Sequence, residues 1–246
     1  MSIFDVFKKK QELASIQLSE IGIDMHSHLI PGIDDGSKSM DETIAMLAKF
    51  ESLGYKKVIT TPHILSDYYK NTPEIILSGL EKVQKTAQHL NLQLEIEAAA
   101  EYYFDEYFLA QIKKKNLLTF GKNNVLLEFG FMEEPSNIES LFFDLLSAGY
   151  QPVLAHFERY TYWLGSIDKA HHFREMGVHI QMNLNSMTGH YGTDVRKQAE
   201  QLVDAGIVDF AGTDCHRIQH LMLLERHLNF PYFHKLLSNP LKNSEL

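Results

Sequence analysis

Segments predicted as strands alternate with segments predicted as helices along most of the chain, and this alternation limits the fold more than any other feature. Seven short apolar or β-branched runs predict strands at 21–25, 57–60, 92–99, 124–129, 151–155, 178–182 and 207–211. Nearly all precede a segment whose apolar residues recur at helical spacing. Such alternation indicates parallel strands joined by helical crossovers. Seven of these units favour a closed or nearly closed α/β barrel over an open sheet.

The composition is typical of a single globular domain. The 246 residues are 44% hydrophobic and 22% charged, and no Pro-, Gly- or Ser-rich linker divides them. We therefore expect one domain over residues 21–246. Residues 1–20 are predicted to be an N-terminal extension. In it, Ile3, Phe4, Phe7 and the lysine run that follows predict a short amphipathic helix, which either packs on the domain or serves in docking or at a membrane surface.

Charge and cysteine content restrict the partners and the compartment. The formal net charge is -9, which argues against nucleic acid as a partner of the whole surface. No segment is long and apolar enough to span a bilayer, and the first residues lack the order of a secretory signal. The single cysteine, Cys215, excludes an internal disulfide and fits a reducing compartment. The chain is therefore expected in the cytoplasm.

Residues that commonly bind metals lie at or just beyond the carboxyl ends of the predicted strands. His26 and His28 are two residues apart, so an extended chain presents both imidazoles on one face. In a βα barrel, the carboxyl ends of all strands meet on one face, where active sites lie. The candidate ligands at this face are His26, His28, Asp35, His63, Glu101, Glu128, His156, Asp214 and His216.

Each candidate has a structural alternative when it is considered alone. A lone His63 or His156 is commonly a hydrogen-bonded structural histidine, Asp35 is an ordinary turn residue, and Asp214 suits a helix cap. Nine such residues at one end of the strands are hard to explain in this way. Carboxylates gathered in one site raise each other's pKa values unless cations lie between them. The pattern therefore predicts a site for several metal ions.

The predicted ligands and their neighbours suit phosphate chemistry. Imidazole and carboxylate together favour manganese, iron or zinc over calcium or magnesium. Metal ions a few ångströms apart lower the pKa of a water between them and clamp the oxygens of a transferring phosphoryl group. Arg159 follows His156 closely, where a guanidinium can bind phosphate oxygens bidentately; the alternative is a surface ion pair with Glu158 or a neighbouring acid. Tyr160 is either part of an aromatic pocket or ordinary loop core.

Several motifs, in their order along the chain, resemble the PHP (polymerase and histidinol phosphatase) superfamily. Within it they are similar to the manganese-dependent bacterial protein tyrosine phosphatases of the CpsB/CapC/YwqE type. The resemblance covers about residues 21–230, and the matching stretches are 24–28, 33–39, 60–63, Glu101, 127–128, 155–160 and 212–216. The Asp34-Asp35-Gly36 loop and the stretch from His156 to Tyr160 distinguish this branch from other PHP enzymes.

The resemblance implies a distorted TIM-like (β/α)7 barrel of the PHP type with three divalent metal ions at the C-terminal ends of its strands. Mn2+ is the implied metal, with iron or zinc as alternatives. The implied ligand sets are His26, His28, Glu101 and Asp214 for the first ion; Glu101, Glu128 and His156 for the second; and Asp35, His63 and His216 for the third.

The resemblance also implies which residues act on the substrate. Arg159 would bind the phosphate, and Arg159 and His216 are the implied catalytic residues. Tyr160 and Arg217 are further implied substrate contacts. Arg217 directly follows His216, whereas the family often carries its further arginine several residues later. Cys215 lacks the phosphate loop of cysteine phosphatases, so it is not expected to be the nucleophile.

The implied function is a metal-dependent protein-tyrosine phosphatase. Its implied substrate is an autophosphorylated, membrane-associated bacterial tyrosine kinase that controls capsule and exopolysaccharide synthesis, met in the cytoplasm at the inner face of the membrane. One alternative is a PHP phosphatase or phosphodiesterase for a small molecule such as histidinol phosphate. The non-enzyme alternative is a metal-stabilised binding module that uses residues 1–20.

Overall fold

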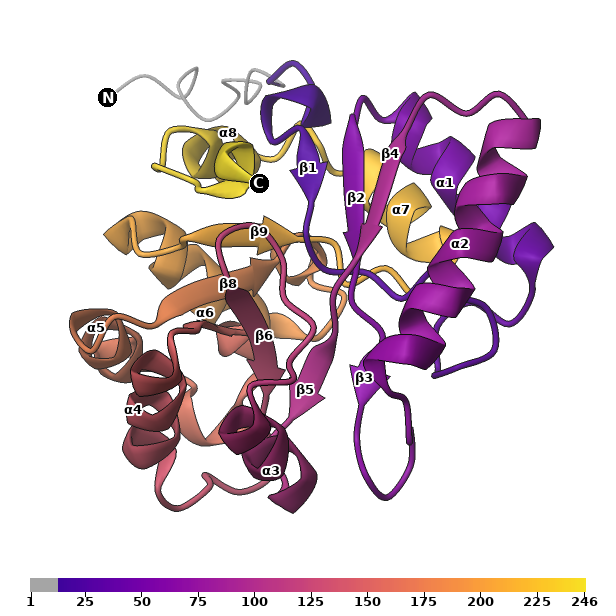
Figure 1. The fold of residues 1–246 in the computed structure, drawn as a ribbon. Coiled ribbons are helices and arrows are strands. Elements are labelled where there is room, and N and C mark those ends of the chain that lie inside the picture. Colours follow the sequence, from indigo (N-terminus) through magenta and orange to yellow (C-terminus); the bar gives the residue numbers. More distant parts are fainter. Residues whose placement is uncertain (1–12) are drawn as a thin grey trace, which may run out of the picture.

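The computed structural model describes residues 13–246, which form a strongly bent, parallel α/β barrel (Figure 1). Every strand pair is parallel. One sheet has the order β1-β2-β4 and the other has the order β3-β5-β6-β7-β8-β9. The strands are β1 Ile23–Asp24, β2 Lys57–Thr60, β3 His63–Ile64, β4 Glu95–Ala98, β5 Glu101–Tyr103, β6 Asn124–Glu128, β7 Gln151–Leu154, β8 His179–Asn183 and β9 Phe210–Gly212.

Eight α-helices cover the outside of the strands in the described part of the chain. Figure 1 shows α1, α2 and α7 beside the three-stranded sheet, and α3 to α6 beside the six-stranded sheet. The helices are α1 Met40–Ser52, α2 Pro73–His89, α3 Glu106–Lys114, α4 Ile138–Ala148, α5 Asp168–Glu175, α6 Thr193–Ala205, α7 Ile218–Glu225 and α8 Pro231–Leu237. The expected alternation of strands and helices is confirmed.

The chain passes from one sheet to the other at two bends. The first lies between β2 and β3 at Thr61 and Pro62, and the second lies between β4 and β5 at Ala99 and Ala100. Proline has no N–H to donate to a strand ladder, so the ladder of β2 cannot continue through Pro62. Backbone bonds still hold the bent strands together, since Glu101 N donates to Pro62 O at 3.1 Å. The bends explain why seven predicted strand regions give nine strands.

The barrel closes between β1 and β9, although no sheet ladder joins these two strands. Beyond the strands, Ser27 forms an isolated parallel bridge with Cys215, and Asp214 N donates to His26 O at 2.8 Å. At the other end, the side chain of Asn243 donates to the carbonyls of Ile23 and Ala211 at 2.9 and 2.8 Å. Figure 1 shows the C-terminus beside β1. The (β/α)7 barrel is therefore closed by local bridges and by a side chain.

The N-terminal residues that the structure describes pack on the barrel. Ile16 and Leu18 are buried in the main core, and Ile16 N donates to Leu228 O at 3.0 Å. Ile3, Phe4 and Phe7, which carry the predicted amphipathic helix, lie outside the described residues. The division of the chain at residue 20 stays a prediction.

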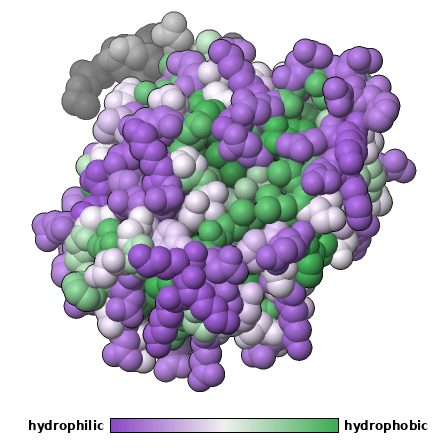
Figure 2. All heavy atoms as spheres, in the orientation of Figure 1, coloured by the Kyte–Doolittle hydropathy of each residue, from purple (hydrophilic) through white to green (hydrophobic). Residues whose placement is uncertain are grey.

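No helix within residues 13–246 is long and apolar enough to cross a membrane. Figure 2 shows hydrophilic side chains over most of one face, with a hydrophobic band across its middle where the two sheets of Figure 1 meet.

Candidate active site

A pocket of about 320 Å3 opens at the carboxyl ends of the strands. The strand ends and the loops that follow them supply its walls, as a βα barrel requires. Nine predicted ligands come together here. The residues that line the open part are Asp35, His63, Glu101, Glu128, Phe131, His156, Arg159, His190, Tyr191, Asp214, His216, Arg217 and His220. His26 and His28 lie beneath it and are fully buried.

The first group of side chains consists of His26, His28, Glu101 and Asp214. His26 Nε2 and His28 Nε2 lie 3.1 and 3.3 Å from Glu101 Oε2, and both lie 3.5 Å from Asp214 Oδ1. One ligand atom from each of His26, His28 and Asp214 lies within 4.8 Å of the others. The structure thus brings together the four residues of the first implied ligand set.

Glu101 also faces the second group, which lies toward β6 and β7. Its Oε1 atom lies 3.0 Å from His156 Nε2, and Glu128 Oε2 lies 3.6 Å from the same nitrogen. His63 Nδ1 lies 3.1 Å from Glu128 Oε1 and 3.2 Å from Glu101 Oε2. Glu101 is therefore placed between the first and second groups, where a bridging carboxylate would have to be.

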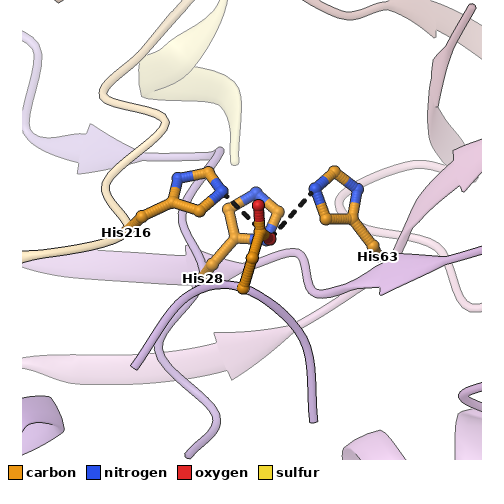
Figure 3. Close-up of side chains that lie close together, drawn as sticks. His28, His63 and His216 are labelled. Carbon is orange, nitrogen blue, oxygen red and sulfur yellow. Dashed lines mark ion pairs between the residues drawn. The ribbon is translucent and has the colours of Figure 1, made fainter. Parts of the chain in front are cut away.

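The third group surrounds Asp35, on the loop after β1. Asp35 Oδ1 lies 3.5 Å from His63 Nε2 and 3.4 Å from His216 Nε2. Figure 3 shows His28, His63 and His216 side by side. The rings of His28 and His216 are stacked, with centroids 4.0 Å apart. His63 thus faces both the second and the third groups, one with each ring nitrogen.

Burial and charge oppose each other at these groups. Burial alone would raise the pKa of Glu101, but His26, His63 and His156 outweigh it and hold that pKa well below its ordinary value. Burial raises the pKa of Asp35 as well, yet its contacts with His216 bring it to about 2. The carboxylates are therefore charged at neutral pH.

The donor set fits metal ions. His28 Nε2 and His63 Nδ1 are buried and have no hydrogen-bond partner among the described residues. Both nitrogens nonetheless face charged carboxylate oxygens at 3.1 to 3.5 Å. A buried polar atom without a partner is costly, and a cation shared by imidazole and carboxylate removes that cost. Imidazole and carboxylate ligands suit manganese, iron and zinc.

A second layer of polar side chains orients the candidate ligands. Asp34 Oδ2 accepts from His28 Nδ1 at 2.8 Å, and Gln181 Oε1 lies 3.1 Å from His26 Nδ1. Asn183 Nδ2 donates to Asp214 Oδ2 at 2.7 Å. Gln181 and Asn183 were not predicted as site residues. Their signal in the sequence is two amides at alternate positions of β8, which point to one face of the strand.

The backbone is strained at two candidate ligands. His156 and Asp214 have φ values of 33° and 50°, in the left-handed region that residues other than glycine rarely adopt. His156 lies just after the end of β7, and Asp214 lies just after the end of β9. The strained turn aims the side chain across the barrel mouth. Gly212 permits this packing, because a Cβ atom there would lie 2.7 Å from His26 Cβ.

Arg159 projects into the pocket between two aromatic rings. Its guanidinium carbon lies 4.3 Å from the centroid of Tyr191 and 4.6 Å from that of Phe131. Its Nη1 donates to Asp214 Oδ2 at 2.9 Å. Burial lowers the pKa of Arg159, but Asp214 outweighs it and raises that pKa above its ordinary value. The predicted alternative is a surface ion pair with Glu158 or a neighbouring acid. Arg159 does form an ion pair, but with Asp214, which is buried at the pocket. Glu158 is buried and accepts from Asn183 N at 2.9 Å instead.

The other predicted substrate contacts differ in position. Arg217 lines the pocket, on the wall that also contains His190 and His220. Tyr160 does not line it: the side chain is fully buried, and its hydroxyl accepts from Phe129 N at 3.1 Å. Tyr160 therefore supports the pocket from below, because it stacks under Phe131. Tyr160 was expected in the pocket because it directly follows Arg159 in the sequence. The 3-10 helix at Phe157–Arg159 ends between these two residues, and their side chains point in different directions.

Cys215 is separated from the pocket chemistry. Its side chain is fully buried and does not line the pocket. Burial raises the pKa of its thiol well above the ordinary value, which leaves the thiol protonated and unreactive.

The sequence matches the family "Capsular polysaccharide synthesis, CpsB/CapC" over residues 22–222. CapC of Staphylococcus aureus is 27% identical over 229 residues, covering 91% of this chain and 90% of CapC. The tyrosine-protein phosphatase YwqE of Bacillus subtilis is 28% identical over 198 residues, covering 80% of this chain and 78% of YwqE.

Solved structures show the same relationship. A structure of the metal-dependent tyrosine phosphatases YwqE from Bacillus subtilis and CpsB from Streptococcus pneumoniae superimposes with a TM-score of 0.76 at 26% identity, covering 89% of this chain and 92% of the other. An amidohydrolase from Mycoplasma synoviae, with a TM-score of 0.53 and 11% identity, shares the fold alone. The chain therefore belongs to the CpsB/CapC family of capsular polysaccharide synthesis proteins.

Proposed function

We propose that this protein is a metal-dependent protein-tyrosine phosphatase that hydrolyses phosphotyrosine. The observation that carries the proposal is one pocket in which imidazole and carboxylate side chains gather beside Arg159, whose guanidinium lies between two aromatic rings. The similarity to YwqE and CpsB, both tyrosine phosphatases, supports the same activity.

The ligands form three overlapping groups, and we propose three divalent metal ions, with Mn2+ as the native metal. The proposed sets are His26, His28, Glu101 and Asp214; Glu101, Glu128 and His156; and Asp35, His63 and His216. Bound divalent ions supply a water of lowered pKa and neutralise the charge on phosphoryl oxygens.

The residues of this chain bind and orient the phosphate. Arg159 donates N–H groups to its equatorial oxygens, whose negative charge increases in the transition state. Phe131 and Tyr191 hold the guanidinium plane, and Asp214 holds its Nη1 edge, so little conformational freedom is lost on binding. Arg217 is a second phosphate contact in this proposal. His216 contributes through its place in the third ligand set.

We propose that the phosphotyrosine lies on a bacterial tyrosine kinase of capsule synthesis, which the protein meets in the cytoplasm at the membrane surface. The family to which the chain belongs supports this assignment. Incubation with the autophosphorylated kinase from the same cell tests it, because only the true substrate loses its phosphotyrosine signal at low enzyme concentration.

Turnover and metal content together test the proposed activity. Protein purified without oxygen is analysed for metals and then assayed on a phosphotyrosine peptide and on histidinol phosphate, before and after chelation. We expect hydrolysis of the peptide in preference to histidinol phosphate, loss of activity on chelation and recovery with Mn2+. Activity that survives complete metal removal contradicts the proposal, and a preference for histidinol phosphate favours the small-molecule alternative.

Arg159→Ala should lower kcat/KM by about 100- to 1,000-fold, because one preorganised donor at the developing charge is removed. Metal content should stay unchanged, since Asn183 still holds Asp214. Arg226→Ala, on the outer surface, is the control. A loss of bound metal in Arg159→Ala would count against a role in phosphate binding.

A further inference from the structure

A second groove begins at the wall of the catalytic pocket. It is lined by the end of β5, by Phe104 directly after it and by the loop that follows β6, and Phe131 belongs to both the groove and the pocket. Its volume is about 720 Å3, compared with about 320 Å3 for the pocket. A substrate segment that leaves the pocket on the Phe131 side therefore enters the groove directly.

The loop over this groove has a fixed base and an exposed tip. Tyr162 Oη donates to Gly130 O at 3.0 Å, and Thr161 Oγ1 donates to Phe131 O. Beyond these anchors, Met132 is 88% exposed, although Phe129 three residues earlier is fully buried. A long, unbranched and flexible apolar side chain at a groove suits contacts with partners of varied sequence.

The charge at the tip is negative. Glu133 and Glu134 follow Met132, and both line the groove. Glu134 lies 3.2 Å from Lys169 Nζ, with both side chains exposed to solvent, whereas Glu133 forms no ion pair with any residue from 13 to 246. Exposed carboxylates beside a groove attract basic side chains and repel acidic ones.

The pocket cannot hold a protein substrate by itself. Its volume suits a phosphate with its aromatic ring, so the residues on either side of a phosphotyrosine must lie on the rim. The rim next to Phe131 offers apolar surface and two carboxylates in a single continuous depression. The geometry points to one occupant for it: an extended polypeptide segment that adjoins the phosphotyrosine and carries lysine or arginine.

We propose that the groove formed by Tyr103, Phe131, Met132, Glu133 and Glu134 binds the residues next to the phosphotyrosine and selects substrates with basic residues there. This inference rests on the proposed phosphatase function. It assigns specificity to a surface separate from the metal ligands, so substitutions in the groove should change the choice of peptide while the hydrolytic step is retained.

Two phosphotyrosine peptides test the inference. They are identical except that four residues flanking the phosphotyrosine are lysine in one and glutamate in the other. Free phosphotyrosine is the third substrate, because it cannot reach the groove. With the metal-loaded protein at low salt, we expect kcat/KM for the lysine peptide to exceed that for the glutamate peptide by about tenfold. Each exposed charge pair changes affinity by up to about fivefold, and the groove offers two carboxylates for such pairs.

Charge reversal of the groove provides the matched variant. Glu133→Lys with Glu134→Lys should invert the preference between the peptides and leave turnover of free phosphotyrosine unchanged. Glu20→Lys with Glu81→Lys changes the net charge by the same amount at exposed positions away from the groove, and it should keep the original preference. Met132→Ser should lower kcat/KM for both peptides but not for free phosphotyrosine.

The outcomes separate the two proposals. One outcome is that free phosphotyrosine is hydrolysed and that both peptides react at equal rates, in the parent protein and in the variants. This result overturns the proposed role of the groove and leaves the phosphatase activity supported. If the variant at Glu20 and Glu81 also inverts the preference between the peptides, the proposed role of the groove is overturned, because net charge alone would then explain the inversion. No turnover of any of the three substrates removes the phosphatase function and the inference with it.

Discussion

His28 shows how one buried side chain depends on its neighbours. Its Nε2 faces Glu101 and Asp214, and its Nδ1 donates to Asp34 Oδ2 at 2.8 Å, so each ring nitrogen has a carboxylate neighbour. Burial lowers the pKa of His28, but Asp34, Asp214 and Glu101 outweigh it and hold that pKa well above the ordinary value. A carboxylate behind a metal-binding imidazole fixes the ring orientation and increases its basicity.

Asp34→Asn should therefore weaken metal binding by about 10- to 100-fold, the usual cost of losing such a partner. Asparagine keeps one acceptor oxygen, so it retains one of the two bonds that the carboxylate accepts from the N–H groups of Gly36 and His63. The bond from Ser37 N to His28 O also remains, so the loop should persist. Competition with a chelator measures the affinity. Asp41→Asn, an exposed aspartate on α1, is the control. Unchanged affinity in Asp34→Asn would show that the carboxylate does not support His28.

Asp209 should make stability depend on pH in the acid range. Burial raises its pKa, but His179, the Ile180 N–H and Arg174 outweigh it and lower that pKa below the ordinary value. A lowered carboxyl pKa stabilises the fold above the unfolded-state pKa of about 3.9, and the contribution is lost as pH falls through the folded-state pKa.

The comparison of Asp209→Asn with the parent protein checks this contribution. At pH 7 the variant should lose about 1 to 2 kcal/mol, a value reduced for the partial exposure of Arg174. Urea unfolding from pH 7 to pH 3 measures the difference, which should shrink as the pH falls below 4. Asp194→Asn, in an exposed pair with Lys197, should show no such trend. A difference that grows in acid would contradict the assignment.

At the scale of elements, close packing of the loop after β1 sets the position of a candidate ligand. Gly36 is buried, and a Cβ atom built there would collide with the carbonyl oxygen and Cβ of His28. These atoms belong to the backbone or adjoin it, so neither can swing aside. Ser37 N also donates to His28 O at 3.1 Å, which holds the loop against the strand end.

Gly36→Ala should push the loop away from His28 and lower both metal occupancy and turnover, by about tenfold or more in metal affinity. Metal analysis after dialysis against a defined Mn2+ concentration measures the occupancy. Lys38→Ala, two residues later and exposed, should bind metal as the parent does. Full occupancy in Gly36→Ala would mean that the loop position does not matter for the ligands.

Helix caps and helix faces show what local pattern can and cannot predict. Ser39 and Glu42 have the spacing of a capping box, which predicts a helix start at Ser39. This is confirmed, because the Ser39 hydroxyl accepts from Glu42 N. Ser136 and Glu139 have the spacing of a capping box and so predict a helix cap at Ser136, which is wrong. Helix α4 begins after Asn137, which adopts a left-handed conformation and makes no side-chain cap. On α1, Ala48 is exposed, whereas Thr43 faces the core and donates to Leu29 O. The spacing of Ile44, Leu47, Ala48 and Leu53 predicts a core face that includes Ala48. Thr43 takes part in that face instead, because its hydroxyl has a buried acceptor.

At the scale of the whole molecule, the closure of the barrel concentrates stability in a few bonds. The side chain of Asn243 makes three hydrogen bonds, to Ile23 O, Ala211 O and Ala211 N, where a strand ladder would otherwise join β1 and β9. Asn243 is 1% exposed, so water cannot replace these bonds without opening the barrel.

Asn243→Ala should lower the free energy of unfolding by about 2 to 3 kcal/mol, from three hydrogen bonds of about 1 kcal/mol each. Activity per folded molecule should stay the same, because the bonds lie at the end of the barrel opposite the pocket. Urea unfolding measures the loss, and Ser244→Ala, at an exposed neighbour, serves as the control. An unchanged unfolding midpoint would show that β1 and β9 are held by other contacts.

The sequence alone determined the α/β barrel and the end of the barrel that holds the site. Strand and helix periodicities are local properties, and parallel strands bring all their carboxyl ends to one face. The nine candidate ligands could therefore be named from their positions after strands. The family resemblance added their division into three sets and the choice of Arg159.

Only the tertiary structure decided what surrounds those ligands. Gln181, Asn183 and Tyr191 contact the ligands or Arg159 from β8 and the segment after it, and no motif links them to residues far away in the sequence. The burial of Tyr160 also depends on packing against Phe131, beneath the pocket. Such contacts join segments that meet only when the barrel closes, because side-chain direction at a turn is set by its neighbours in space.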